Sequence, residues 1–162
     1  MAAETSLPPR PALARIRPAR AEDWDRLWPL LVGMGQVTAG TPAKERFLRV
    51  LVHEAECLPV AEWQGDLLGY AWAHQGPLHL RAGRSSVRLN DLYVSPAWRR
   101  QGVGRHLFAA MLRWATARGT DWLEWQASLA SVPFYERLGY TGRPERDPEH
   151  PSFEITLAPD LA

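Results

Sequence analysis

The stretch Leu92-Tyr93-Val94-Ser95-Pro96-Ala97-Trp98-Arg99-Arg100-Gln101-Gly102-Val103-Gly104 decides the fold of this chain. It begins at the end of a segment, residues 87–94, that is predicted to be a strand, and the Ser-Pro pair at 95–96 terminates that strand. The segment that follows has apolar residues at helical spacing, from Val103 to Ala115. The stretch is therefore predicted to be a strand, a loop with two glycines and the start of a helix from about Gly102 to Arg118.

The loop between this strand and this helix has the chemistry of an anion site. Glycines let the backbone approach a ligand closely, and a helix start contributes unpaired N–H groups and partial positive charge. Arg99, Arg100 and Arg105 add full positive charges. We expect a phosphate or diphosphate here, and the alternative is a tight turn with solvated arginines. A dinucleotide fingerprint is disfavoured because Leu107 stands where its third glycine is needed, and the chain has no Gly-Lys-Ser/Thr tripeptide of a P-loop.

The remaining elements predict an α/β (α+β) domain with a mixed sheet, in the order β-α-α-β-β-β-α-β-α-β. Ala21-Glu22-Asp23 opens the first helix, with acidic residues that suit its dipole. The second helix is predicted to start with Thr41 as its cap and Pro42 at the first position, and its inner face is read as Phe47, Leu48, Leu51 and Val52. The predicted strands are 15–17, 58–63, 67–73, 87–94, 122–126 and 153–157, with a short helix at 132–138. Residues 1–13 are expected to be a flexible lead and not a signal peptide, residues 14–158 the domain, and residues 159–162 a tail.

Composition indicates one globular domain. The chain has 162 residues, 46% of them hydrophobic, and 19 basic against 18 acidic residues give a net charge of +1. This balance does not call for nucleic acid, although an arginine-rich nucleic-acid binder stays an alternative, and no run approaches the roughly 20 apolar residues of a membrane span. The lone cysteine, Cys57, excludes an intrachain disulfide and fits a cytoplasmic protein. The five histidines show no metal spacing, so no metal is expected.

Two motifs carry a family resemblance. Arg99-Arg100-Gln101-Gly102-Val103-Gly104 resembles the Arg/Gln-x-x-Gly-x-Gly/Ala signature of the GNAT superfamily of N-acetyltransferases, and Pro133-Phe134-Tyr135-Glu136-Arg137-Leu138-Gly139-Tyr140 resembles that family's Phe-Tyr-Glu-Lys-Leu-Gly-Phe segment. The resemblance implies the single-domain GNAT fold, in which a mostly antiparallel central sheet, flanked by helices, splays between its fourth and fifth strands.

The resemblance also implies acetyl-CoA as cosubstrate. Its diphosphate is expected on the loop and the first helical turn, and its pantetheine arm in the splay, against the strand end. A backbone N–H near Tyr93 or Val94 would then hold the developing oxyanion. The implied binding residues are Leu92, Tyr93, Val94, Arg99, Arg100, Gln101, Gly102, Val103, Gly104, Arg105 and, where the family often has asparagine, Ser128. Ser131, close to it, also suits the N-cap of the short helix.

The general acid implied by the resemblance is Tyr135, whose phenol is protonated at neutral pH and can give a proton to the leaving thiolate. The alternative is a packing aromatic beside Phe134.

The general base is less clear from the residues. The segment Asn90-Asp91-Leu92-Tyr93-Val94 resembles the Glu-Asp-hydrophobic-aromatic-Val strand of polyamine acetyltransferases, but Asn90 fills the position of the glutamate base, and a carboxamide cannot accept the proton. Asp91 is the nearest carboxylate, but alternation along a strand places it on the face opposite to Asn90. Its alternative is a strand-edge carboxylate paired with an arginine. A water-mediated route through Asn90 or Gln126 is a further option, and the remaining candidates on neighbouring strands are Glu124 and His74.

The expected function is transfer of acetyl from acetyl-CoA to a primary amine of a small molecule or peptide, by direct attack in a ternary complex. The alternative is a catalytically quiet CoA-binding sensor or interaction module with the same fold. A homodimer is compatible with either.

Overall fold

The computed structural model describes residues 14–35, 43–81, 83, 85–143 and 148–157. One sheet runs through it in the order β1-β3-β4-β5-β6-β7, with the short β2 paired to β4. The strands are β1 (Arg15–Pro18), β2 (Glu56–Cys57), β3 (Pro59–Trp63), β4 (Asp66–Gln75), β5 (Ser86–Val94), β6 (Trp122–Gln126) and β7 (Ser152–Thr156). The helices are α1 (Trp24–Met34), α2 (Ala43–Val52), α3 (Val103–Ala117) and α4 (Val132–Arg137). The described strands pair antiparallel except β5 and β6, which are parallel.

The predicted class, element order and GNAT-type architecture are confirmed, with differences of detail. Two 3-10 turns, Ala21–Asp23 and Pro96–Trp98, and the short strand β2 were not predicted. The expected lead at 1–13, the cap at Thr41 and the tail at 159–162 lie outside the described residues. Within the described ranges, no helix combines the length and the apolar character needed to cross a membrane.

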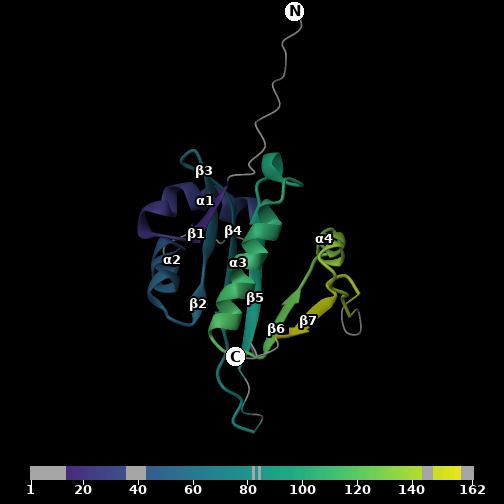
Figure 1. Cartoon of the computed structure of the whole chain (residues 1–162). Helices are drawn as coiled ribbons and strands as arrows, with labels where there is room; N and C mark the ends of the chain where they lie inside the picture. The colour runs from purple at the N-terminus through teal and green to yellow at the C-terminus, as the bar shows by residue number, and fades with distance from the viewer. Residues whose placement is uncertain (1–13, 36–42, 82, 84, 144–147, 158–162) are drawn as a thin grey trace, which may run out of the picture.

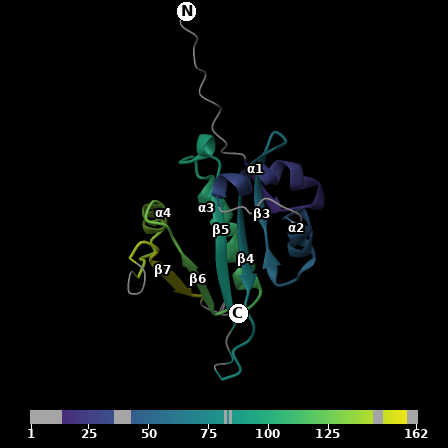
Figure 2. The same ribbon diagram turned by 180° about the vertical axis from the view of Figure 1, so that it is seen from behind.

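Helices cover both faces of the sheet (Figures 1 and 2). On β4, Ala71 and Ala73 pack in the core cluster that contains the inner face of α3, whereas Tyr70 and Trp72 pack with residues of α1 and α2. Because side chains alternate along a strand, these two pairs face opposite sides of the sheet. The α1 and α2 side and the α3 side are therefore separate layers.

The strands β5 and β6 diverge. Their parallel pairing covers Ser86 to Leu89 of β5, and the rest of that strand, to Val94, continues without β6 beside it. Figure 1 shows β6, β7 and α4 leaning away from β5 toward the upper right. The predicted splay between the fourth and fifth predicted strands corresponds to this divergence.

A β-bulge interrupts β5 where the divergence begins. Trp72 of β4 pairs with Asp91 and the next residue, Ala73, pairs with Leu89, so Asn90 is an extra residue on β5. A bulge of this kind resets the alternation of side chains.

A buried ionic network fixes the start of α1 against the sheet. The guanidinium of Arg17 lies 2.7 Å from Asp23 and 2.8 Å from Glu62, and Arg26 also contacts Glu62 at 3.2 Å. Asp23 is fully buried, and hydrogen bonds from Arg17 hold the pKa of its carboxyl below the usual value. Asp23 was predicted to serve the helix dipole; it instead anchors α1 to β1 and β3 through Arg17.

We expect Asp23→Ala to lower the free energy of unfolding by about 3 kcal/mol, because it leaves the buried guanidinium of Arg17 with one partner fewer. Urea unfolding followed by tryptophan fluorescence measures this. Glu22→Ala is the matched control, since Glu22 is exposed and 3.9 Å from Arg20, and its loss should cost less than about 0.5 kcal/mol. Equal losses in the two variants would contradict the role given to Asp23.

Candidate active site

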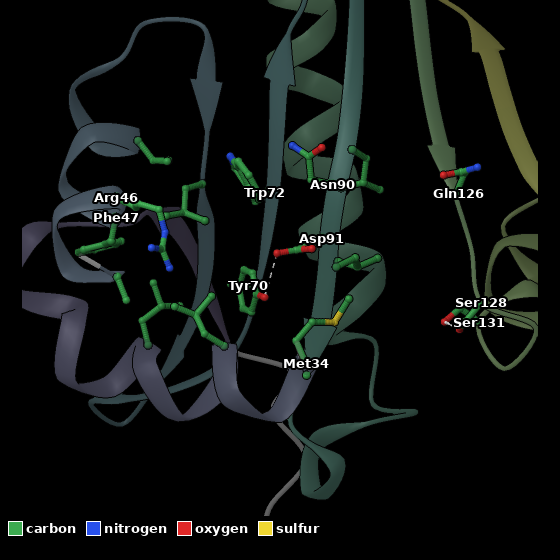
Figure 3. A pocket seen from close by; sticks show the side chains of 18 of the residues that line it. Met34, Arg46, Phe47, Tyr70, Trp72, Asn90, Asp91, Gln126, Ser128 and Ser131 are labelled. Carbon is green, nitrogen blue, oxygen red and sulfur yellow. Dashed lines mark hydrogen bonds between the residues drawn. The ribbon is translucent and has the colours of Figure 1, made fainter. Parts of the chain in front are cut away.

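A cavity of about 850 Å³ lies where β5 leaves β6. It is bounded by α1 and α2 on one side and reaches the end of β6 and the start of α4 on the other (Figure 3). Apolar and aromatic side chains form much of its wall, among them Leu27, Trp28, Leu31, Phe47 and Trp72. The predicted site residues that line it are Asn90, Asp91, Leu92, Ser128 and Tyr135, together with Gln126. The structure thus gathers residues from β5, β6 and α4 around one space.

Asn90 and Asp91 face the same side of the sheet, and the prediction that they face opposite sides is wrong. The side chain of Asn90 contacts His74, and that of Asp91 contacts Tyr70, and both partners belong to the same face of β4. The extra residue at the bulge accounts for this, because it turns two consecutive side chains toward the cavity.

Asp91 is a carboxylate in a partly desolvated setting. Its Oδ2 accepts a hydrogen bond of 3.1 Å from the Tyr70 hydroxyl, and among the described residues it has no arginine partner, contrary to the alternative considered above. Burial raises the pKa of Asp91 above its usual value, and the hydrogen bond from Tyr70 partly offsets this effect. A carboxylate with a raised pKa is a stronger base than an exposed one.

The side chain of Asn90 is positioned by a hydrogen bond to His74. Its amide Nδ2 lies 2.9 Å from His74 Nδ1, so the amide nitrogen donates and His74 accepts. The Oδ1 atom of Asn90 is then available to accept a hydrogen bond from another group. His74 therefore positions Asn90 and does not itself line the cavity.

Tyr135 lies at the α4 side of the cavity and is 5% exposed. Its ring contacts Trp125, Phe134 and Phe153, with centroids 5.1, 4.9 and 5.3 Å away. Burial raises the pKa of the phenol above its usual value, so the hydroxyl stays protonated at any physiological pH. Tyr135 thus packs in an aromatic cluster and also brings a protonated hydroxyl to the cavity wall.

The arginine-glycine loop joins the end of β5 to α3. Arg100 and Gly102 have φ angles of 59° and 88°, in the left-handed region that glycine adopts most easily. The first backbone bond of α3 runs from His106 N to Gly102 O at 3.1 Å, so the N–H groups before His106 have no helical partner. Arg100, Gly102 and Arg105 are exposed. An exposed helix start with these cations fits a diphosphate.

Arg99 is placed differently from its two arginine neighbours. Its Nε donates to Val94 O at 2.9 Å, and its guanidinium lies 5.6 Å from the centroid of the Tyr93 ring. Gln101 donates to Ala97 O at 3.0 Å. These two side chains hydrogen-bond to the backbone of the loop, whereas Arg100 and Arg105 are exposed cations beside them.

At the far wall, Ser128 Oγ and Ser131 Oγ lie 2.9 Å apart. Ser131 is at the N-cap position of α4, but its side chain makes no capping hydrogen bond, so the expected cap is absent. Of the other base candidates, Gln126 lines the cavity, whereas Glu124 pairs with Arg88 at 3.5 Å and does not.

The family resemblance implies that the first two helices shape the acceptor side, but the sequence did not single out which residues of α2 line the cavity. Ala43, Arg46, Phe47 and Val50 line the cavity at helical spacing, and Arg49 lies beside them. The inner face read from the sequence was partly wrong, because Leu48 is 37% exposed and Val52 is 82% exposed. The signal that could have been used was an arginine inside an otherwise apolar stripe. His150 also lines the cavity and was not predicted.

The chain belongs to the acetyltransferase (GNAT) family, which it matches over residues 21–140. It is similar to a glucosamine 6-phosphate N-acetyltransferase of Trypanosoma brucei brucei, with 30% identity over 76 residues. That match covers 47% of this chain and 52% of the relative, so the chain spans about half the length of the curated relative it matches.

Two solved structures show the same fold. Glucosamine-6-phosphate N-acetyltransferase from Arabidopsis thaliana superposes with a TM-score of 0.71 at 18% identity, over 82% of this chain and 94% of that one. The PaiA N-acetyltransferase from Thermoplasma acidophilum, in complex with coenzyme A, gives a TM-score of 0.72 at 15% identity, over 89% and 99% of the two chains.

Proposed function

We propose that this protein transfers acetyl from acetyl-CoA to a primary amine of a small molecule or peptide, by direct attack in a ternary complex. The observation that carries the proposal is the cavity at the splay, which has a carboxylate of raised pKa, Asp91, and a protonated phenol, Tyr135, in its walls. A base and an acid at one site are what amine acylation needs.

The edge of β5 and the arginine-glycine loop suit acetyl-CoA, the carrier of the acyl group. The edge of β5 beyond Leu89 has no β6 partner, so an extended amide-containing arm could pair with it at Leu92, Tyr93 and Val94, where Val94 O already accepts from Arg99 Nε. The N–H groups from Arg100 to Gly104, with Arg100 and Arg105, would hold its diphosphate. When bound, the carrier supplies an activated acyl group as a thioester.

Each site residue then has one task. Asp91 takes the proton from the ammonium form of the acceptor, because only the neutral amine has a lone pair for attack. Asn90 Oδ1 accepts a hydrogen bond from the same amine and orients it. Tyr135 gives its hydrogen bond, and finally its proton, to the sulfur that leaves.

A covalent route through cysteine has no support. Cys57 is the single cysteine of the chain, and it is absent from the cavity wall. Burial raises the pKa of its thiol to about 12, so almost no thiolate exists at neutral pH. This favours direct attack over an acyl-enzyme.

Release of free thiol from acetyl-CoA in the presence of a panel of amines tests the proposal. Glucosamine 6-phosphate belongs in that panel, because two of the similar proteins are named for it. We expect turnover with at least one amine, and calorimetry should detect binding of coenzyme A. Binding without turnover on any amine would favour the quiet CoA-binding module, and no binding would overturn both.

We expect Tyr135→Phe to lower kcat by about 100-fold while the Kd for coenzyme A stays within about twofold, because the variant loses one proton donor and keeps the aromatic packing. Steady-state kinetics and calorimetry measure the two values. Tyr140→Phe is the matched control, since Tyr140 packs on Phe108 and Trp125 at 5.5 Å in the same cluster but does not line the cavity. An unchanged kcat in Tyr135→Phe would remove this hydroxyl from the mechanism.

A further inference from the structure

The α2 wall of the cavity carries positive charge. Arg46 and Arg49 both line the cavity, and Figure 3 shows Arg46 reaching from α2 toward the strand that bears Tyr70 and Trp72. Neither arginine forms an ion pair with any residue that the structure describes. A guanidinium is always charged and presents a planar fork that matches carboxylate and phosphate groups.

The facing wall of the same cavity carries the opposite charge. Asp91 lies on β5, with its side chain directed to the Tyr70 hydroxyl (Figure 3). Aromatic side chains stand between the two charged walls, and the indole of Trp72 is fixed by a hydrogen bond of 2.7 Å from its Nε1 to Glu56. The cavity is therefore cationic at the α2 wall, apolar in the middle and anionic at the facing wall, where Asp91 lies.

We infer that the acceptor is a primary amine that also carries an anionic group, a carboxylate or a phosphate, on an apolar body. The inference rests on the proposed function and deepens it. The ammonium of such a molecule meets Asp91, its anion pairs with the fork of Arg46, and its body lies against Phe47 and Trp72.

The carrier's diphosphate does not explain these arginines. Phe47 of α2 packs with Tyr70 on one face of the sheet, whereas the arginine-glycine loop opens α3, which covers the other face. Arg46 therefore lies on the acceptor side, and its loss should leave the use of acetyl-CoA unaffected.

The test compares amines that differ in the anionic group alone. One pair is phenylalanine and 2-phenylethylamine, and the other is 3-aminopropyl phosphate and propylamine, so the two pairs distinguish a carboxylate from a phosphate. We expect the anionic member of at least one pair to have a kcat/KM more than tenfold higher with the unaltered protein. In Arg46→Glu that ratio should fall by at least tenfold while the KM for acetyl-CoA is unchanged.

Lys44→Glu is the matched control. Lys44 is an exposed cation of the same helix that does not line the cavity, so this variant has the same charge change and should keep the original ratio. The two amines of a pair differ in intrinsic nucleophilicity, but this difference is the same for every variant. It therefore cancels when the ratio of their kcat/KM values is compared between variants.

The outcomes separate the two proposals. Thiol release with equal or better use of the neutral amines overturns the inference and leaves the proposed function standing. A preference for anionic amines that survives Arg46→Glu overturns the role of Arg46. Absence of thiol release with every amine overturns the proposed function, and the inference with it.

Discussion

Gly102→Glu is expected to weaken coenzyme A binding by more than about 100-fold. The residue has a φ of 88°, which glutamate adopts only with strain, and it directly precedes α3. The new carboxylate would stand beside the helix start, where it repels a diphosphate and competes for the N–H groups. Calorimetry with coenzyme A measures the effect.

Gly119→Glu is the control for this prediction. Gly119 also has a positive φ, 65°, and a side chain there would meet no atom within 4 Å, but it lies past the other end of α3. The control therefore carries similar backbone strain and the same charge, and its affinity for coenzyme A should stay within about twofold. Full affinity in Gly102→Glu would mean that the loop does not hold the carrier.

The second large effect is expected for Asp91→Asn, which should lower kcat/KM by about 10²- to 10⁴-fold because a carboxamide cannot take the proton of the amine. Asparagine still accepts the hydrogen bond from Tyr70, so coenzyme A affinity should be retained. The pH profile gives an independent readout. The base form of Asp91 exists above its raised pKa, so kcat/KM should fall as the pH drops through that value.

Tyr70→Phe should shift the pH profile of kcat/KM to higher pH. The Tyr70 hydroxyl donates to the Asp91 carboxylate and lowers its pKa, so removal of the hydroxyl should raise that pKa further. The acidic limb of the profile should then shift to higher pH, with the plateau at high pH little changed. A limb that stays in place would exclude Asp91 as the base.

Local sequence signals were sufficient for the loop and for most elements. The turn from Val94 to Gly104 is encoded by residues that are neighbours in the chain, namely a Ser-Pro stop and two glycines before an apolar helical stripe. Its loop and helix could therefore be predicted from composition and spacing alone.

The wall that holds Asn90 and Asp91 could not be predicted in the same way. The bulge arises from the register between β4 and β5, where Trp72 and Ala73 skip one residue of the partner strand. Nothing in the run from Val87 to Val94 marks the extra residue, so strict alternation gave the wrong face for Asp91. The pairing of Asp23 with Arg17 is likewise a contact between separate elements.

The way α2 is attached has a consequence for how the protein can change over evolutionary time. Phe47 is its single buried residue, Leu51 packs against the same cluster, and the other residues are exposed or half-buried, so few side chains bind this helix to the domain. Substitutions at its other positions should cost little stability. Natural variation can therefore explore new acceptors on this helix, while β5 and the start of α3, which hold the carrier in the proposed function, stay under constraint.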